Sequence, residues 1–175
     1  NIEVLDTTLR DGEQTSGVSF AVQEKVSIVR LLLEELHVDR VEVASARVSS
    51  GELEAVRRIA SWARSHDMLD KVEVLGFIDK GVSIDWLEQT GCRVLNLLCK
   101  GSFKHVSEQL RKTPEQHIQD ICDEVALATE KGITVNVYLE DWSNGIQHSP
   151  KYVFQLMDGL KDLPLRHFML PDTLG

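Results

Sequence analysis

Arg10 and Asp11 stand side by side near the beginning of the chain, after a short apolar run and directly before Gly12. Arginine stays protonated in proteins, so Arg10 can present a fixed, planar set of donors to a carboxylate or a carbonyl oxygen. Asp11 offers hard carboxylate oxygens, which suit Mg, Mn or Zn. An isolated Arg-Asp pair is usually only an ion pair in a loop. The pattern therefore indicates either such a pair or a site that binds an oxyanion beside a divalent metal.

The sequence around this pair matches a known signature. Residues 6–14 read Asp-Thr-Thr-Leu-Arg-Asp-Gly-Glu-Gln, residues 136–141 read Asn-Val-Tyr-Leu-Glu-Asp, and residues 170–175 read Leu-Pro-Asp-Thr-Leu-Gly. In this order they resemble the metal-dependent TIM-barrel superfamily of acyl-CoA synthases and lyases. That superfamily includes the isopropylmalate, citramalate and homocitrate synthases and the hydroxymethylglutaryl-CoA lyases. The first string is most similar to the synthases, and the three matches extend over the whole chain.

Short β-branched runs alternate with longer helical patterns along the sequence. The strands are expected at residues 2–7, 40–45, 71–77, 92–98, 133–140 and 165–170. The helices are expected at about 21–37, 50–66, 82–90, 114–131 and 149–161. Strict alternation of strands and helices predicts an α/β fold with a parallel sheet.

Polar residues in the middle of strands decide between two parallel-sheet architectures. Glu42, Glu73, Asn96 and Asn136 lie on the strand face opposite the Val and Leu side chains. In an open doubly wound sheet both faces meet helices, where such groups are costly to bury. In a (β/α)8 barrel this face points inward, where the groups can pair. A whole barrel needs about 250 residues. We therefore expect an incomplete TIM barrel of about six strands and five helices.

Residues 1–175 are accordingly interpreted as the N-terminal three-quarters of a catalytic domain, without strands seven and eight and without any C-terminal regulatory domain. The net charge of −9 argues against nucleic acid or an anionic membrane as partner. No apolar run reaches the roughly 18 residues of a membrane span. Three cysteines without Cys-x-x-Cys spacing favour a reducing, cytoplasmic compartment.

Active sites of such barrels form at the carboxyl ends of the strands. Arg10 and Asp11 follow the first expected strand, and the other candidates at these ends are Leu75, Leu98, Tyr138, Glu140 and Thr173. The resemblance assigns Asp11 to a divalent metal (Zn, Mn or Mg), together with two histidines one residue apart on the seventh strand. None of the six histidines forms such a His-x-His pair. With one of three ligands present, we expect this chain alone to lack activity and to bind metal weakly.

The resemblance implies an acyltransferase that joins acetyl-CoA to a 2-oxo acid in a Claisen-type condensation. The expected catalytic residues are Arg10, which would stabilise alkoxide character, and Glu140, which would orient or activate the base. Tyr138 would line the pocket, and Thr173 would donate a hydrogen bond to the substrate carboxylate. A structural ion pair between Glu140 and Arg10 is the alternative for these two side chains.

The choice of substrate is expected to depend on Leu75 and Leu98, because two leucines suit the methyl group of pyruvate and reject a second carboxylate. Residues 43–49 lack the Phe-Pro string usual in isopropylmalate synthases, and residues 138–145 resemble citramalate synthases. We therefore expect (R)-citramalate as the product, in isoleucine biosynthesis, and a homodimer of the full-length protein. The alternatives are a 2-isopropylmalate synthase acting on 2-oxoisovalerate for leucine, a hydroxymethylglutaryl-CoA lyase, and a non-catalytic or regulatory half-barrel.

Overall fold

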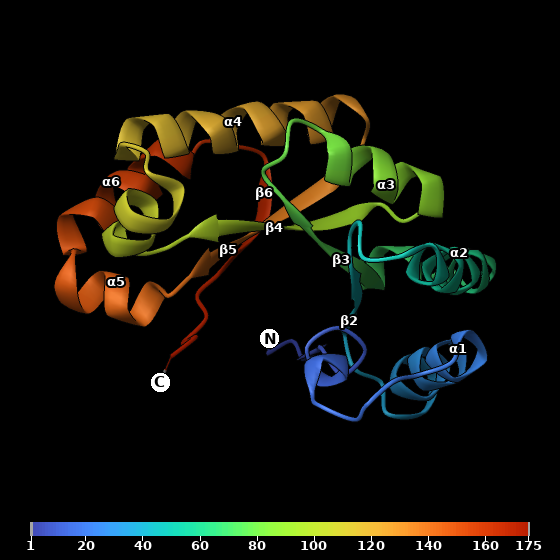
Figure 1. The fold of residues 1–175 in the computed structure, drawn as a ribbon. Coiled ribbons are helices and arrows are strands. Elements are labelled where there is room, and N and C mark those ends of the chain that lie inside the picture. The colour runs from blue at the N-terminus through green and yellow to red at the C-terminus, as the bar shows by residue number, and fades with distance from the viewer. Residues whose placement is uncertain (1, 175) are drawn as a thin grey trace. The chain divides into compact units, whose positions relative to one another are not determined.

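The six strands follow one another through a single sheet in the order β1-β2-β3-β4-β5-β6 (Figure 1). The structure is a computed structural model and describes residues 2–174. The pairs β1–β2, β2–β3 and β5–β6 are parallel. Sequential order is the topology of a (β/α)8 barrel, whereas a doubly wound sheet reverses its order at a switch point. The barrel topology predicted from the polar strand faces is therefore confirmed.

The strands are β1 (Leu5–Asp6), β2 (Arg40–Ser45), β3 (Val72–Phe77), β4 (Val94–Lys100), β5 (Thr134–Glu140) and β6 (Leu165–Met169). The α-helices are α1 (Val22–Arg30), α2 (Ser50–Ser65), α3 (Val82–Thr90), α4 (Pro114–Glu130), α5 (Trp142–His148) and α6 (Pro150–Leu160). Short 3-10 turns form η1 (Gly12–Gln14) and η3 (Leu69–Lys71), and π-helical turns form η2 (Leu31–Glu35) and η4 (His105–Leu110). No helix in the described part of the chain has the length and apolar character needed to cross a membrane.

Three elements differ from expectation. The first strand has only two residues, because the apolar residues before it are exposed: Ile2 is 94 % and Val4 53 % exposed. The first helix changes to π-helical hydrogen bonding at Leu31 rather than running on regularly. Helix α5 was not expected, because its sequence Trp-Ser-Asn-Gly is rich in residues that favour turns.

One compact unit comprises residues 1–76 and 82–95. Helix α1 packs on α2, and α2 packs on α3. Ser49 caps α2 by accepting a hydrogen bond from the N–H of Glu52 at 3.1 Å. On the strands, Glu73 is fully buried and accepts a hydrogen bond from Arg40 at 3.0 Å. One of the polar inner-face residues thus has a charged partner inside this unit.

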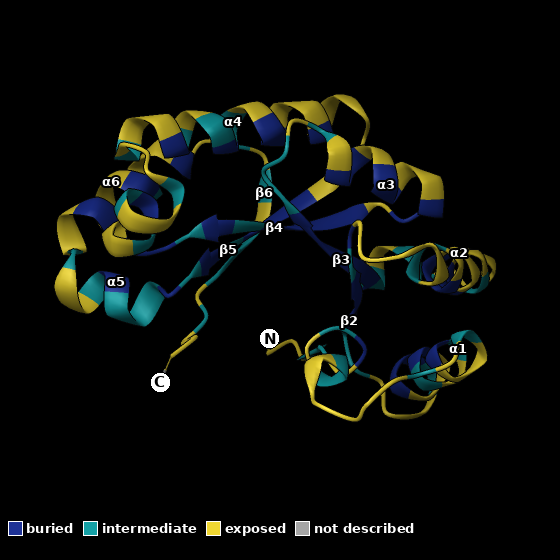
Figure 2. Cartoon of the chain, in the orientation of Figure 1, coloured by how far each residue is buried: buried dark blue, intermediate teal, exposed yellow. Residues whose placement is uncertain are grey.

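The second compact unit comprises residues 77–81 and 96–175. Helix α4 packs on α6, and α6 packs on α5. Asn136 on β5 donates a hydrogen bond to Asn96 on β4 at 2.8 Å, and both side chains are fully buried. This bond confirms that inner-face polar residues of neighbouring strands pair with each other. In Figure 2, strands β4 and β5 are mostly buried, β6 is half-buried, and helices α4 and α6 are buried on one side and exposed on the other.

Candidate functional site

Arg10 lies in the turn that follows β1. The carbonyl oxygen of Thr7 accepts hydrogen bonds from the N–H groups of Arg10 and Asp11 at 3.1 and 2.8 Å, which closes the turn. The guanidinium donates through Nε to Glu42 Oε1 at 2.5 Å and through Nη1 to Asp11 Oδ1 at 2.8 Å. The Glu42 side chain is fully buried, so the arginine is anchored to the sheet. Sequence reasoning missed Glu42 as this partner, although an acid on the adjacent strand was a usable signal.

Asp11 is the one metal ligand expected from these residues. Its side chain is 61 % exposed at the carboxyl end of β1, where one oxygen already accepts from Arg10. Within residues 2–174, no three His, Cys, Asp or Glu side chains form a group that could hold a metal ion. The hard oxygens of Asp11 fit a divalent cation as a single ligand. The described residues therefore fit part of the metal site that the resemblance implies and do not complete one.

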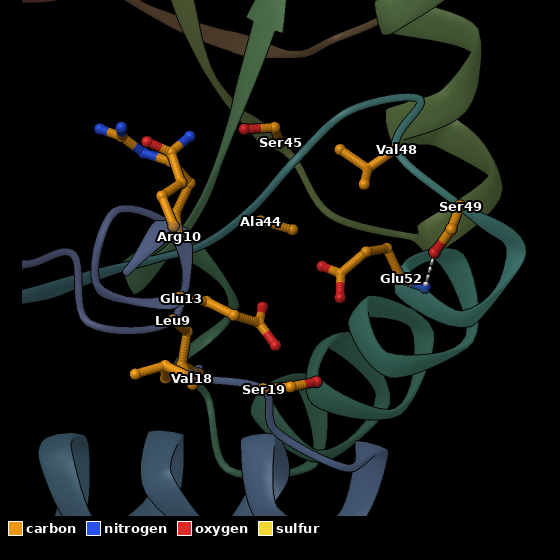
Figure 3. Close-up of a pocket in the computed structure, with 11 residues that line it drawn as sticks. Leu9, Arg10, Glu13, Val18, Ser19, Ala44, Ser45, Val48, Ser49 and Glu52 are labelled. Atoms are coloured by element: carbon orange, nitrogen blue, oxygen red, sulfur yellow. Dashed lines mark hydrogen bonds between the residues drawn. The ribbon is translucent and has the colours of Figure 1, made fainter. Parts of the chain in front are cut away.

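A cavity of about 390 Å³ opens beside Arg10, between the segment after β1 and the connection from β2 to α2 (Figure 3). Glu13 and Glu52 both point into this space, and the Arg10 guanidinium points away from them. Lys25 on α1 is only 2 % exposed and its ammonium pairs with both carboxylates, at 2.5 Å for Glu13. Glu13 also accepts a hydrogen bond from the N–H of Phe20 at 3.0 Å. The buried lysine thus anchors the loop that carries Arg10 and Asp11, a role that sequence reasoning missed.

Glu140 ends β5, and its carboxylate pairs with the ammonium of Lys100 at the end of β4. The ion pair with Arg10 considered from the sequence stays a prediction, because Arg10 belongs to the other compact unit. Lys100 is itself fixed at its backbone: its N–H donates to His117 Nε2 at 3.0 Å and its carbonyl accepts from Tyr152 Oη at 2.6 Å. His117 is 1 % exposed, and this burial lowers its pKa to about 4, so the ring is neutral and accepts. Helices α4 and α6 thus both position the partner of Glu140.

Thr173 follows β6, and its Oγ1 accepts a hydrogen bond from the N–H of Asp141 at 3.0 Å. Leu75 is buried near the end of β3, and Leu98 and Tyr138 are half-buried near the ends of β4 and β5. All of the candidates therefore lie at or just after the carboxyl ends of their strands. Arg10, Asp11 and Leu75 belong to the first unit, and Leu98, Tyr138, Glu140 and Thr173 belong to the second. Their roles as substrate or metal contacts remain predictions.

A second cavity, of about 580 Å³, lies in the second unit beside Asp141. Asp141 is 3 % exposed, and its carboxylate accepts from Asn144 Nδ2 at 2.8 Å and lies 3.6 Å from His105 Nε2. Ser102 contributes another hydrogen bond to the same carboxylate. These contacts are not visible in the sequence pattern, and the only usable signal was that Asp141 directly follows Glu140.

Comparison with known proteins supplies relatives over the whole chain. The HMGL-like family model matches residues 1–175. A Methanopyrus kandleri protein provisionally named (R)-citramalate synthase is 30 % identical over 175 residues, which cover 99 % of this chain and 32 % of that protein. The 2-isopropylmalate synthase of Sulfolobus acidocaldarius is 30 % identical over 176 residues, which cover 99 % of this chain and 43 % of that protein. The chain thus spans 32 % and 43 % of the length of these two relatives.

A solved structure shows the same fold. The HMG-CoA lyase of Acinetobacter baumannii, determined in complex with coenzyme A and 3-methylmalate, superposes with a TM-score of 0.67 at 20 % identity. The match covers 99 % of this chain and 57 % of that one. A family model that matches every residue, relatives at 30 % identity and the sequential parallel sheet agree with one another. This chain belongs to the HMGL-like family.

Proposed function

We propose that the full-length protein condenses acetyl-CoA with a 2-oxo acid, and that pyruvate is the acceptor, giving (R)-citramalate for isoleucine biosynthesis. The anchored guanidinium of Arg10 carries this proposal. Nε is held by buried Glu42 at 2.5 Å and Nη1 by Asp11 at 2.8 Å, so a permanent positive charge stands beside an exposed oxygen ligand. The relatives named as citramalate and isopropylmalate synthases support the same reaction class.

Arg10 would act on the keto group of the 2-oxo acid. When a carbanion adds to this carbonyl, negative charge develops on its oxygen, and a guanidinium fixed in advance stabilises that charge without reorganising. The contact with Glu42 fixes the orientation of the planar guanidinium of Arg10. A flexible side chain would have to adopt that orientation again at each turnover. A divalent cation, bound through Asp11 and ligands outside these residues, would add Lewis-acid polarisation of the same carbonyl.

Glu140 would orient or activate the base that removes a methyl proton from acetyl-CoA. Its carboxylate is held at the end of β5 by the ion pair with Lys100, so it has a fixed position from which to orient a base. Tyr138 would line the pocket, and Thr173 would donate a hydrogen bond to the carboxylate of the 2-oxo acid. Hydrolysis of the resulting thioester would release coenzyme A and complete the reaction.

Leu75 and Leu98 would set the preference for pyruvate. Both are apolar side chains near the carboxyl ends of their strands, β3 and β4. An apolar wall makes burial of the second carboxylate of 2-oxoglutarate costly. It discriminates less strongly against 2-oxoisovalerate, because one or two methyl groups correspond to about 1–3 kcal/mol. The 30 % identity with a 2-isopropylmalate synthase keeps that activity as the second candidate.

The test is turnover by the full-length protein with acetyl-CoA and each of pyruvate, 2-oxoisovalerate and 2-oxoglutarate, measured as the release of free coenzyme A thiol. We expect kcat/KM for pyruvate to exceed that for 2-oxoisovalerate by about tenfold or more. Chiral chromatography should identify the product as (R)-citramalate. A preference for 2-oxoisovalerate would establish the second candidate, and cleavage of hydroxymethylglutaryl-CoA without condensation would indicate a lyase. Absence of any turnover would contradict both synthase proposals.

A further inference from the structure

Asp141 has an unusual backbone. It precedes α5 with φ 64° and ψ 31°, the left-handed region, and its side chain does not cap the helix. Residues other than glycine rarely adopt this backbone conformation, and among them aspartate and asparagine tolerate it best. In this conformation the N–H of Asp141 donates to Thr173 Oγ1 at 3.0 Å. The strained turn therefore joins the end of β5 to the segment after β6.

This bond determines what the Thr173 hydroxyl can do. A hydroxyl has one hydrogen to donate and two lone pairs that accept. Because the N–H of Asp141 occupies one lone pair, the hydroxyl hydrogen has to point in another direction. Thr173 is exposed, so that direction is open to a ligand. A hydroxyl fixed in this way is a directed donor, as a substrate carboxylate requires.

The carboxylate of Asp141 holds the turn in place. It is 3 % exposed and accepts from Asn144 on α5 at 2.8 Å, from Ser102 after β4, and lies 3.6 Å from His105 on η4. Burial alone would raise its pKa, but the two hydrogen bonds and the nearby charges of His105 and Lys104 outweigh burial and hold the pKa below its usual value. The Asp141 carboxylate is therefore charged, and it is anchored by α5 and by the segment after β4.

We propose that Asp141 is a positioning residue for the 2-oxo acid, which acts by fixing the donor direction of the Thr173 hydroxyl. Its carboxylate anchors the left-handed turn, and its N–H fixes Thr173. The inference deepens the proposed function and rests on it. It adds a residue that touches no substrate but determines how tightly the substrate carboxylate is held.

The test uses Asp141→Ala, Asp141→Asn, Thr173→Val and the double variant Asp141→Ala/Thr173→Val in the full-length protein. Asp141→Ala removes the anchor and disfavours the left-handed turn, so KM for the 2-oxo acid should rise by about tenfold or more, as on loss of a hydrogen bond to a charged group. KM for acetyl-CoA should not change. Asparagine keeps an acceptor and tolerates the turn, so Asp141→Asn should stay within about threefold of the wild type.

Thr173→Val should raise the same KM as much as Asp141→Ala, and the double variant should raise it no further, because both single changes remove one contact. Asp141→Gly replaces Asp141→Ala if the alanine variant does not fold, because glycine reaches the turn without strain. Ser107→Ala is the matched control: its hydroxyl lines the same cavity but bonds only within its own turn, to Phe103 and Lys104, so KM should not change.

Effects of Asp141→Ala and Thr173→Val that multiply in the double variant would overturn the inference and leave the proposed function intact. Equal rises in KM for both substrates would also overturn it, because they would indicate a general structural role. If the wild-type protein turns over no 2-oxo acid, the proposed function fails and this inference fails with it.

Discussion

Replacing His117 with glutamine should remove a pH-dependent part of the stability. The ring is 1 % exposed, and its Nε2 accepts the N–H of Lys100 at 3.0 Å. Burial lowers its pKa from 6.5 to about 4. His117 binds a proton at higher pH in the unfolded chain than in the folded chain. Its contribution to the free energy of unfolding is therefore fully present above about pH 6.5 and is lost as the pH falls to about 4. The difference between the two values corresponds to about 3 kcal/mol.

Glutamine can place its carbonyl oxygen near the position of Nε2 and accept the same N–H without titrating. At pH 7 we expect His117→Gln to cost about 1 kcal/mol through imperfect packing. Between pH 7 and pH 4 the wild type should lose about 3 kcal/mol more than the variant, so the variant should be the more stable protein at the acidic end. Urea unfolding followed by tryptophan fluorescence at steps of half a pH unit measures this difference directly.

The comparison with the variant cancels the titration of carboxylates that both proteins share. Ile121→Val, a fully buried position on the same helix, provides the control, because it should cost about 1 kcal/mol at every pH. Unfolding free energies of the wild type and His117→Gln that run parallel from pH 7 to pH 4 would refute the reasoning. A gap that widens in favour of the wild type at low pH would show that the protonated ring is the stable form.

The remaining predictions concern the loop after β1 and the proposed pocket. Leu98→Ala in the full-length protein should lower the ratio of pyruvate to 2-oxoisovalerate turnover by several-fold, since one methyl contact corresponds to about 1 kcal/mol; an unchanged ratio would contradict its role. Arg10→Lys keeps the charge but loses the planar fork held by Glu42, so steady-state assays should show turnover of every 2-oxo acid depressed alike. Lys25→Met leaves Glu13 and a second carboxylate without their shared cation, so urea unfolding should show a loss of about 3 kcal/mol, and a loss under 1 kcal/mol would argue against the anchoring role.

The strand order could be predicted from the sequence because the side-chain period of a strand is two residues. Once Asn96 and Asn136 are assigned to the face opposite the apolar one, they can pair if their strands are neighbours, and the 2.8 Å bond between them shows that they do. The extent of β1 could not be predicted in the same way. Its apolar residues satisfy the pattern, but Ile2 and Val4 are exposed, and the pattern contains no information on burial.

The sequence predicted that the candidate residues lie at strand ends, but it did not predict the side chains that hold them. Arg10 is conspicuous in the sequence, whereas its bond to Glu42 depends on strand register. Glu42 and Glu73 are aligned across β2 and β3, and like charges there would repel. Glu42 forms an ion pair with Arg10, and Glu73 forms one with Arg40. These two positive charges offset the repulsion between the carboxylates. A register with an irregularity between Glu42 and Ala44 follows from tertiary packing and cannot be read from local spacing.

Gly101 directly follows β4 and Gly145 lies in α5, where the backbones of the two glycines approach each other closely. A Cβ added at Gly145 would lie 2.1 Å from the carbonyl oxygen of Gly101, and one added at Gly101 would lie 2.5 Å from that of Leu139. At Gly145, α5 therefore packs directly against backbone atoms. Unlike a side chain, the backbone cannot change rotamer to make room for a larger residue. In a saturation-mutagenesis library both glycines should be intolerant to every substitution, and no change at one should rescue a change at the other. The neighbouring side chains can change over generations while these two positions remain glycine.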